Sequence, residues 1–205
     1  MRFYIETTII ADWLFFHTIK PSNRKRLRRS VRSSYRLVEK IIDYKVRSRN
    51  FVTSNWAILE AIGSVKRSRT QFNMLTQNIS FGYYDDVKDQ KGFRLERHQI
   101  SEIHRLAERL RHRKAVRWSA LRWSRAPIVF EDAVFFIMLG LDAPDAVHAA
   151  IATAEGCNVL VTRDGDFLKR KKTLQPYFQV VEPFEALKLL KRSREPLTTR
   201  IQLGG

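Results

Sequence analysis

Short β-prone runs alternate along this chain with longer segments that have helical spacing. The β-prone runs lie at residues 2–5, 51–53, 158–162 and 178–181. No hairpin sequence joins neighbouring runs, and 8 glycines and 6 prolines are too few for a turn-rich all-β fold. Strands connected by helices pair in parallel, and a parallel sheet is covered by helices on both faces. The alternation therefore predicts an α/β fold, a three-layer α/β/α sandwich around a short parallel sheet.

Apolar residues three and four positions apart predict the helices. The spacing is clear at residues 27–42 and 100–110, where the remaining faces are rich in arginine and lysine. We also expect helices over 7–16, 54–65, 133–139, 142–156 and 183–190, and a loop over 80–91. A length of 205 residues suits one domain, which we expect to span residues 1–205.

The charge is strongly positive and unevenly distributed. The net charge is +17, and two segments, residues 20–49 and 94–125, account for all of it. Such segments on a neutral body indicate a surface for a polyanion such as nucleic acid, although two solvated helix faces would give the same pattern. The expected nucleic-acid contacts are Arg24, Lys25, Arg26, Arg28, Arg29, Arg113, Lys114 and Arg117.

Cysteine content and hydropathy indicate the compartment. Cys157 is the single cysteine, so the chain has neither an internal disulfide nor a multi-cysteine zinc site. No apolar run approaches the roughly 18 residues of a membrane span. We expect a cytoplasmic protein without membrane contact.

Carboxylates recur where the predicted strands end. Glu6 follows the first strand, Asp164 and Asp166 follow the strand at 158–162, and Asp145 opens the helix before it. Glu60 interrupts an otherwise small and apolar helix. Each has an ordinary alternative as a helix-terminal, turn, solvent-facing or arginine-paired acid. Together at one sheet edge they would repel one another, which favours a divalent ion such as Mg²⁺ or Mn²⁺.

Four segments with these acids resemble the acidic motifs of PIN-domain nucleases. They are YIETT at 4–8, TSNWAILE at 53–60, DAVHAA at 145–150 and VTRDGDF at 161–167. The last two are the most specific, and the resemblance covers residues 1–18, 51–66 and 127–190. The family includes the toxin ribonucleases of VapBC-type toxin–antitoxin pairs.

The resemblance implies a PIN-like sandwich and an Mg²⁺- or Mn²⁺-dependent endoribonuclease acting on RNA. It also implies a homodimer and, for a toxin, a small antitoxin partner. The implied catalytic residues are Glu6, Glu60, Asp145 and Asp164. The implied metal ligands are Glu6, Asp145, Asp164 and Asp166, with hydroxyl groups from Thr7 or Thr162.

Two features depart from the family pattern. Glu6 stands where the family usually has aspartate, and two basic helical insertions are expected at about 20–50 and 67–126. An RNA-processing nuclease without an antitoxin and a non-catalytic RNA-binding scaffold therefore remain alternatives. We expect His148 to be packed in the core, and Arg163 is a candidate phosphate contact that points away from Asp164 if the strand extends that far.

Overall fold

A parallel five-stranded sheet organises the structure, a computed structural model that describes residues 1–43, 50–113, 115–119 and 126–192. The strand order is β3-β2-β1-β4-β5, so the first strand of the chain lies at the centre. Phe3 pairs with Phe51 on one side and with Val159 on the other. The strands are β1 (Phe3–Ile5), β2 (Phe51–Ser54), β3 (Val116–Ser119), β4 (Val159–Val161) and β5 (Gln179–Val181).

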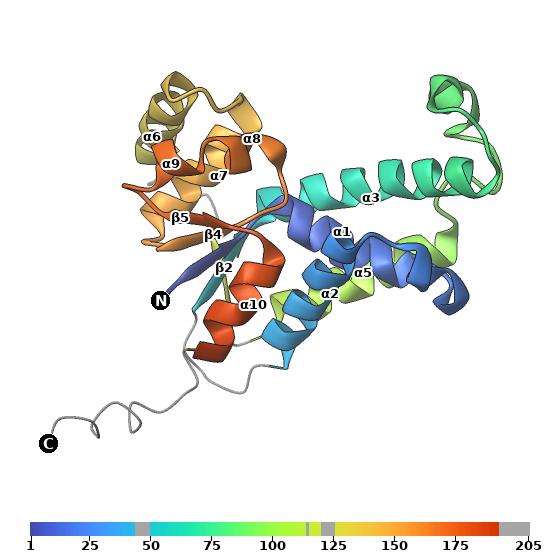
Figure 1. Cartoon of the computed structure of the whole chain (residues 1–205), viewed down its shortest axis with the longest axis horizontal. Coiled ribbons are helices and arrows are strands. Elements are labelled where there is room, and N and C mark those ends of the chain that lie inside the picture. Colours follow the sequence, from blue (N-terminus) through green and yellow to red (C-terminus); the bar gives the residue numbers. More distant parts are fainter. Residues whose placement is uncertain (44–49, 114, 120–125, 193–205) are drawn as a thin grey trace, which may run out of the picture.

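Alternating side chains of the strands feed two apolar clusters, one on each face of the sheet. Phe3, Ile5 and Val161 join the first cluster, beneath α1 (Thr7–Thr18), α2 (Arg29–Ile42), α3 (Asn55–Thr76), α5 (Arg97–Arg111) and α10 (Pro183–Arg192). Tyr4 and Leu160 join the second, beneath α6 (Ala126–Met138) and α7 (Ala143–Ala154). Figure 1 shows these helices on opposite sides of the sheet. The predicted three-layer α/β/α fold is confirmed.

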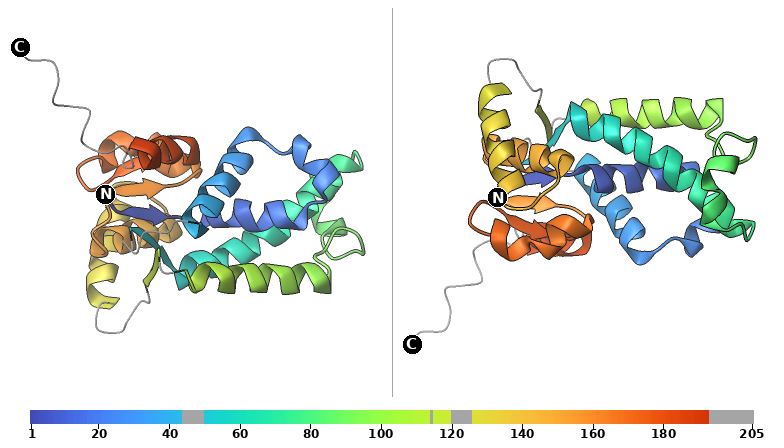
Figure 2. Two further views of the ribbon diagram at one scale, coloured as in Figure 1. Left: turned by 90° about the horizontal axis from the view of Figure 1, so that it is seen from below. Right: turned by 90° about the horizontal axis from the view of Figure 1, so that it is seen from above.

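Helices of the first layer extend beyond the sheet. Both views in Figure 2 show α1, α3 and α5 running side by side away from the strands. The basic segments fold against this layer through apolar residues at helical spacing, since Leu37, Val38 and Ile41 of α2 and Ile103 and Leu106 of α5 are all buried. The shorter elements are η1 (Pro21–Arg26), η2 (Phe81–Tyr83), α4 (Tyr84–Val87), α8 (Gly165–Lys169) and α9 (Lys171–Leu174).

The structure differs most clearly from the sequence expectation in the three places that follow. In addition, α3 continues to Thr76, past the expected end at residue 65, and η1, α8 and α9 were not predicted. Strand β3 was not predicted, and it lies within the range 67–126 that was expected to be a helical insertion. The range 80–91 was expected to be a loop but contains η2 and α4. Helix α6 begins at Ala126 instead of Ala133, because Pro127 lies in the first turn, where a missing backbone N–H costs nothing.

Cys157 is buried and carries a free thiol. Among the described residues, no helix is both long and apolar enough to cross a membrane.

Candidate active site

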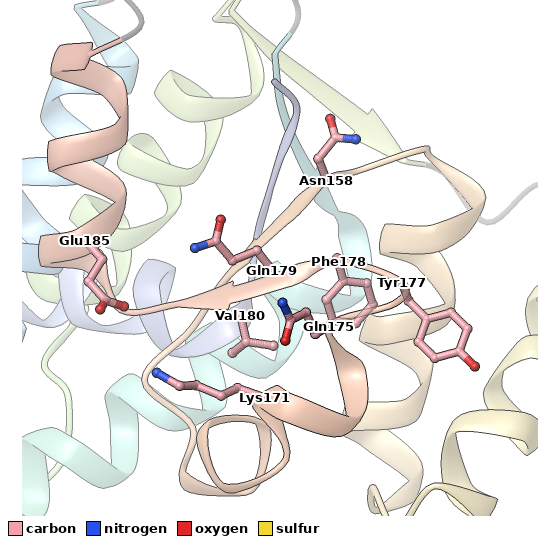
Figure 3. Close-up of a pocket in the computed structure, with 8 residues that line it drawn as sticks. All are labelled: Asn158, Lys171, Gln175, Tyr177, Phe178, Gln179, Val180 and Glu185. Carbon is pink, nitrogen blue, oxygen red and sulfur yellow. The ribbon is translucent and has the colours of Figure 1, made fainter.

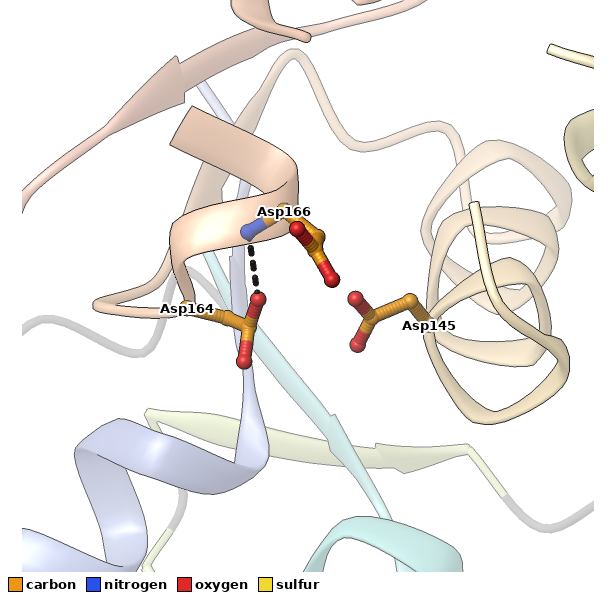
Figure 4. Close-up of side chains that lie close together, drawn as sticks. All are labelled: Asp145, Asp164 and Asp166. Atoms are coloured by element: carbon orange, nitrogen blue, oxygen red, sulfur yellow. Dashed lines mark hydrogen bonds between the residues drawn. The ribbon is translucent and has the colours of Figure 1, made fainter. Parts of the chain in front are cut away.

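Three aspartates converge at the carboxyl edge of the sheet. Asp145 lies in the first turn of α7, Asp164 caps α8, and Asp166 lies in the first turn of α8. One carboxylate oxygen from each lies within 4.8 Å of those of the other two. Figure 4 shows the three side chains facing one another across the space between α7 and α8. We call these residues the aspartate trio.

Hydrogen bonds fix two of these positions. Asp164 accepts from the backbone N–H of Asp166 at 2.7 Å, and this bond starts the helix. Asp142 accepts in the same way from the N–H of Asp145 at 2.9 Å, at the start of α7. The side chain of Asp145 is left pointing into the space shared with the other two.

The trio concentrates negative charge in a partly desolvated place. Burial, together with the nearby charges of Asp164, Asp142 and Glu6, raises the pKa of Asp145 to about 7. Lys169 offsets part of the charge through a 3.0 Å contact with Asp166. Three carboxylates at this spacing match the hard oxygen ligands that Mg²⁺ and Mn²⁺ prefer, so the residues present fit such an ion.

Glu6 lies beside the trio but is not part of it. It caps α1, and its Oε2 accepts from the Thr8 N–H at 2.9 Å, from the Thr8 hydroxyl at 2.5 Å and from the Thr162 hydroxyl at 2.9 Å. The Thr162 hydroxyl also accepts from the backbone N–H of Asp164 at 2.8 Å. Thr162 thus links the sequence-predicted Glu6 to Asp164.

Glu60 belongs to a neighbouring group. Its Oε2 accepts from the Thr7 hydroxyl at 2.8 Å and contacts Nε2 of His148 at 2.6 Å. Burial opposes the charge of Glu60, but the hydrogen bonds from His148 and Thr7 outweigh it and leave the pKa of Glu60 below its usual value. Glu60 is therefore ionised at neutral pH and held in one orientation.

His148 is buried, as expected, and it is also hydrogen-bonded on both sides of its ring. Its Nδ1 lies 2.8 Å from the Tyr4 hydroxyl, which lies 3.2 Å from the Ser54 hydroxyl. A carboxylate only accepts, so Nε2 donates to Glu60, and in the neutral ring Nδ1 then accepts from Tyr4. Sequence reasoning missed this series of hydrogen bonds, because Tyr4 reads as an ordinary strand residue and Ser54 as a helix cap.

Arg163 forms an ion pair with a residue that the sequence analysis did not single out. Its Nη1 lies 2.8 Å from Asp12 and donates to the Ser30 hydroxyl at 3.3 Å. The Ser34 hydroxyl also donates to Asp12 at 2.6 Å. Arg163 thus ties α1 and α2 to the turn that carries Asp164, as a positioning group for that turn.

The expected nucleic-acid contacts divide into two groups. Lys25, Arg26, Arg28 and Arg29 are exposed around η1 and the start of α2, and Arg24 lies over the Phe16 ring. Arg113 is exposed before β3, whereas Arg117 pairs with Glu155 at 3.1 Å. Lys114 lies outside the described residues. These two groups come from distant parts of the fold.

A separate pocket of about 620 Å³ lies along β5 and is shown in Figure 3. Its lining includes Lys171, Gln175, Gln179 and Glu185 but none of the trio. A single carboxylate beside an edge strand offers no comparable set of ligands, so the chemistry is assigned to the trio.

A family model described as PIN domain matches residues 28–173. The matched range contains Glu60 and the whole trio and begins after Glu6. A search of curated proteins finds none that matches the chain. PIN domains are metal-dependent nucleases, which agrees with the acidic cluster described above. Because the match spans well over half of its length, the chain belongs to the PIN domain family.

Proposed function

We propose that this protein is an Mg²⁺- or Mn²⁺-dependent endoribonuclease that hydrolyses RNA phosphodiester bonds. The observation that carries the proposal is the convergence of Asp145, Asp164 and Asp166 within 4.8 Å. Membership of the PIN domain family supports metal-dependent cleavage of nucleic acid. The choice of RNA follows the resemblance to toxin ribonucleases.

The residues in and around the trio would have different roles in hydrolysis. A divalent ion, when bound, lowers the pKa of a coordinated water and neutralises charge on the phosphate. Asp145, Asp164 and Asp166 would hold that ion, and the buried Glu6 adds negative charge beside them. Glu60, ionised and oriented by His148 and Thr7, would orient the attacking water.

Cleavage of single-stranded RNA by the purified chain, with Mn²⁺ or with EDTA, tests the proposal. Asp164→Asn and Asp145→Asn each remove a ligand charge and are expected to lower the cleavage rate by about 100-fold or more. Asp89→Asn removes an exposed carboxylate far from the trio and is the matched control.

Two outcomes contradict the proposal. One is cleavage that persists in EDTA, and the other is an Asp164→Asn variant that cuts as fast as the control. RNA binding without cutting, unchanged in both site variants, would instead favour the non-catalytic scaffold.

We also propose a protein partner, either a second copy of the chain or the small antitoxin of a toxin pair. Exposed apolar side chains on α6 support it: Phe130 is 70% and Met138 81% exposed, and Val134 and Phe135 lie nearby on the helix. Sedimentation of the wild type and of Phe130→Ser distinguishes the cases. A dimer lost in Phe130→Ser supports self-association, whereas a monomer in both favours the antitoxin.

A further inference from the structure

A groove between α2 and α10 has not been assigned a role. It encloses about 790 Å³ and is lined by both helices, which Figure 1 shows next to each other. We propose that this groove binds the phosphate backbone of a nucleic-acid strand and leads it to the aspartate trio. The direction of this path rests on the nuclease function proposed above.

The lining of the groove is strongly cationic. Six arginines and lysines face two carboxylates there, and the six are Arg29, Arg32, Arg36, Lys40, Lys188 and Lys191. One of the two carboxylates, Glu39, is already engaged, because it accepts from Trp13 Nε1 at 2.7 Å and lies 3.6 Å from Arg109. Asp43, at the end of α2, is the other.

None of the six cations forms an ion pair with a carboxylate in the part of the chain that the structure describes. The second basic helix, α5, is different. Arg105 pairs with Glu102 at 2.6 Å, and Arg111 pairs with Glu108 at 3.5 Å. Cations without a carboxylate partner remain available to an anionic ligand, and the groove gathers six of them, of which Arg29 and Lys188 also lie over the Phe184 ring.

The geometry fits a chain of phosphates better than a single anion. The cations of α2 run from Arg29 to Lys40, eleven residues that span about 16 Å along the helix. Lys188 and Lys191 form a second row on α10. Repeated positive charge along one direction matches the regular negative charge of a nucleic-acid backbone.

One end of the groove lies at the same sheet edge as the trio. Arg163, which precedes Asp164, donates to Ser30 at the start of α2. Phe184, at the start of α10, lies three residues after the end of β5, and Arg29 lies over its ring at 5.1 Å. A strand lying in the groove would therefore reach the carboxyl edge, where the phosphodiester would be cut.

Binding of fluorescein-labelled single-stranded RNA by the full chain in EDTA tests the groove without cleavage. The groove variant is Arg32→Gln, Arg36→Gln and Lys188→Gln, three exposed positions where we expect substitution to preserve the fold. The control is Arg105→Gln, Arg111→Gln and Lys88→Gln, which removes the same charge outside the groove. Thermal unfolding followed by circular dichroism checks that both variants fold.

The groove variant is expected to bind on the order of 10-fold more weakly than the control at physiological salt. The slope of log affinity against log salt is expected to fall by about 2, since each lost phosphate contact contributes roughly 0.7 for a single strand. The affinity for single-stranded DNA of the same sequence should fall by the same factor, because the cations contact the phosphates. Equal affinities of the two variants for the RNA would overturn the proposal.

The failures of the two proposals can be told apart. If RNA binding depends on the groove residues but no Mn²⁺-dependent cleavage occurs, the groove proposal is supported and the nuclease proposal is rejected. If cleavage depends on Mn²⁺ but the groove and control variants bind RNA equally well, the nuclease proposal is supported and the groove proposal is rejected.

Discussion

Tyr4 shows how a buried hydroxyl supports a carboxylate that it does not touch. Its hydroxyl donates to His148, which donates to Glu60. Tyr4→Phe leaves Nδ1 of His148 without a donor, and a buried unpaired polar atom costs about 1–3 kcal/mol. We expect urea unfolding to show a loss of that size, whereas Tyr83→Phe, at a 60% exposed position, should change stability by less than about 0.5 kcal/mol. Equal effects of the two substitutions on the free energy of unfolding would mean that the Tyr4 hydroxyl does not stabilise the fold.

Asp12 gives the protein a pH-dependent stability. Burial raises the pKa of Asp12 to about 6, and Arg163 and Ser34 offset the effect only in part. This pKa lies above the value of about 3.9 in an unfolded chain, so the carboxyl group favours folding below pH ~4 and loses that contribution as the pH rises through 6.

The Asp12→Asn variant does not titrate there and isolates this effect. Between about pH 4 and pH 7, the free energy of unfolding of the wild type should fall relative to that of Asp12→Asn, by up to about 3 kcal/mol. Urea unfolding of both proteins across this range measures the difference. A difference that stays constant with pH would show that Asp12 titrates as in an unfolded chain.

The residues of the site were predictable to different degrees. The aspartates of the trio were predicted, together with Glu6, to meet at one sheet edge, because each follows a strand or opens a helix. The contacts of Glu60 were not predicted, since Thr7 and His148 lie 53 and 88 residues away in the sequence and contact Glu60 only in the folded chain. Asp12 could have been found by the signal that marked Glu60, a lone charge within an apolar helical segment.

At the scale of the elements, two glycines of similar appearance in the sequence have opposite roles. Gly140 ends α6 with a φ of +93°, and an added Cβ would lie 2.9 Å from Nε of Arg170. Gly63 lies within α3, with nothing within 4 Å of an added Cβ.

Alanine substitutions should separate these two roles. Gly140→Ala is expected to destabilise the protein by about 1–2 kcal/mol, because alanine is strained at positive φ. Gly63→Ala is expected to stabilise it by about 0.5–1 kcal/mol, because alanine has the higher helix propensity. Thermal unfolding of the two variants measures both effects, and shifts of the same sign would contradict this assignment.

The strand that escaped prediction is short and lies at an edge of the sheet. Strand β3 has four residues, and two of them, Arg117 and Trp118, are only partly buried. Edge strands lack the continuous apolar run that marks the central strands β1 and β4. The pairing of Val116 with Phe51 therefore had no local sequence signal.

For the whole molecule, binding of a divalent ion should be visible as stability. A ligand that binds the folded state alone at 100 times its Kd adds about 2.7 kcal/mol, and each kcal/mol raises the Tm by about 2–4 °C at this size. We expect saturating Mn²⁺ to raise the Tm of the wild type and of Asp89→Asn, and EDTA to reverse the rise. Asp164→Asn should show little response. A response of Asp164→Asn equal to that of the wild type would place the ion elsewhere.

The central position of β1 makes the sheet depend on segments that are distant along the chain. Phe3 pairs with Val159, 156 residues further on, and this pairing brings Glu6 to Thr162 and so to the turn that holds Asp164. Contacts of such long sequence separation form late and slow folding. A fragment that lacks either β1 or β4 therefore cannot place Glu6 beside the trio.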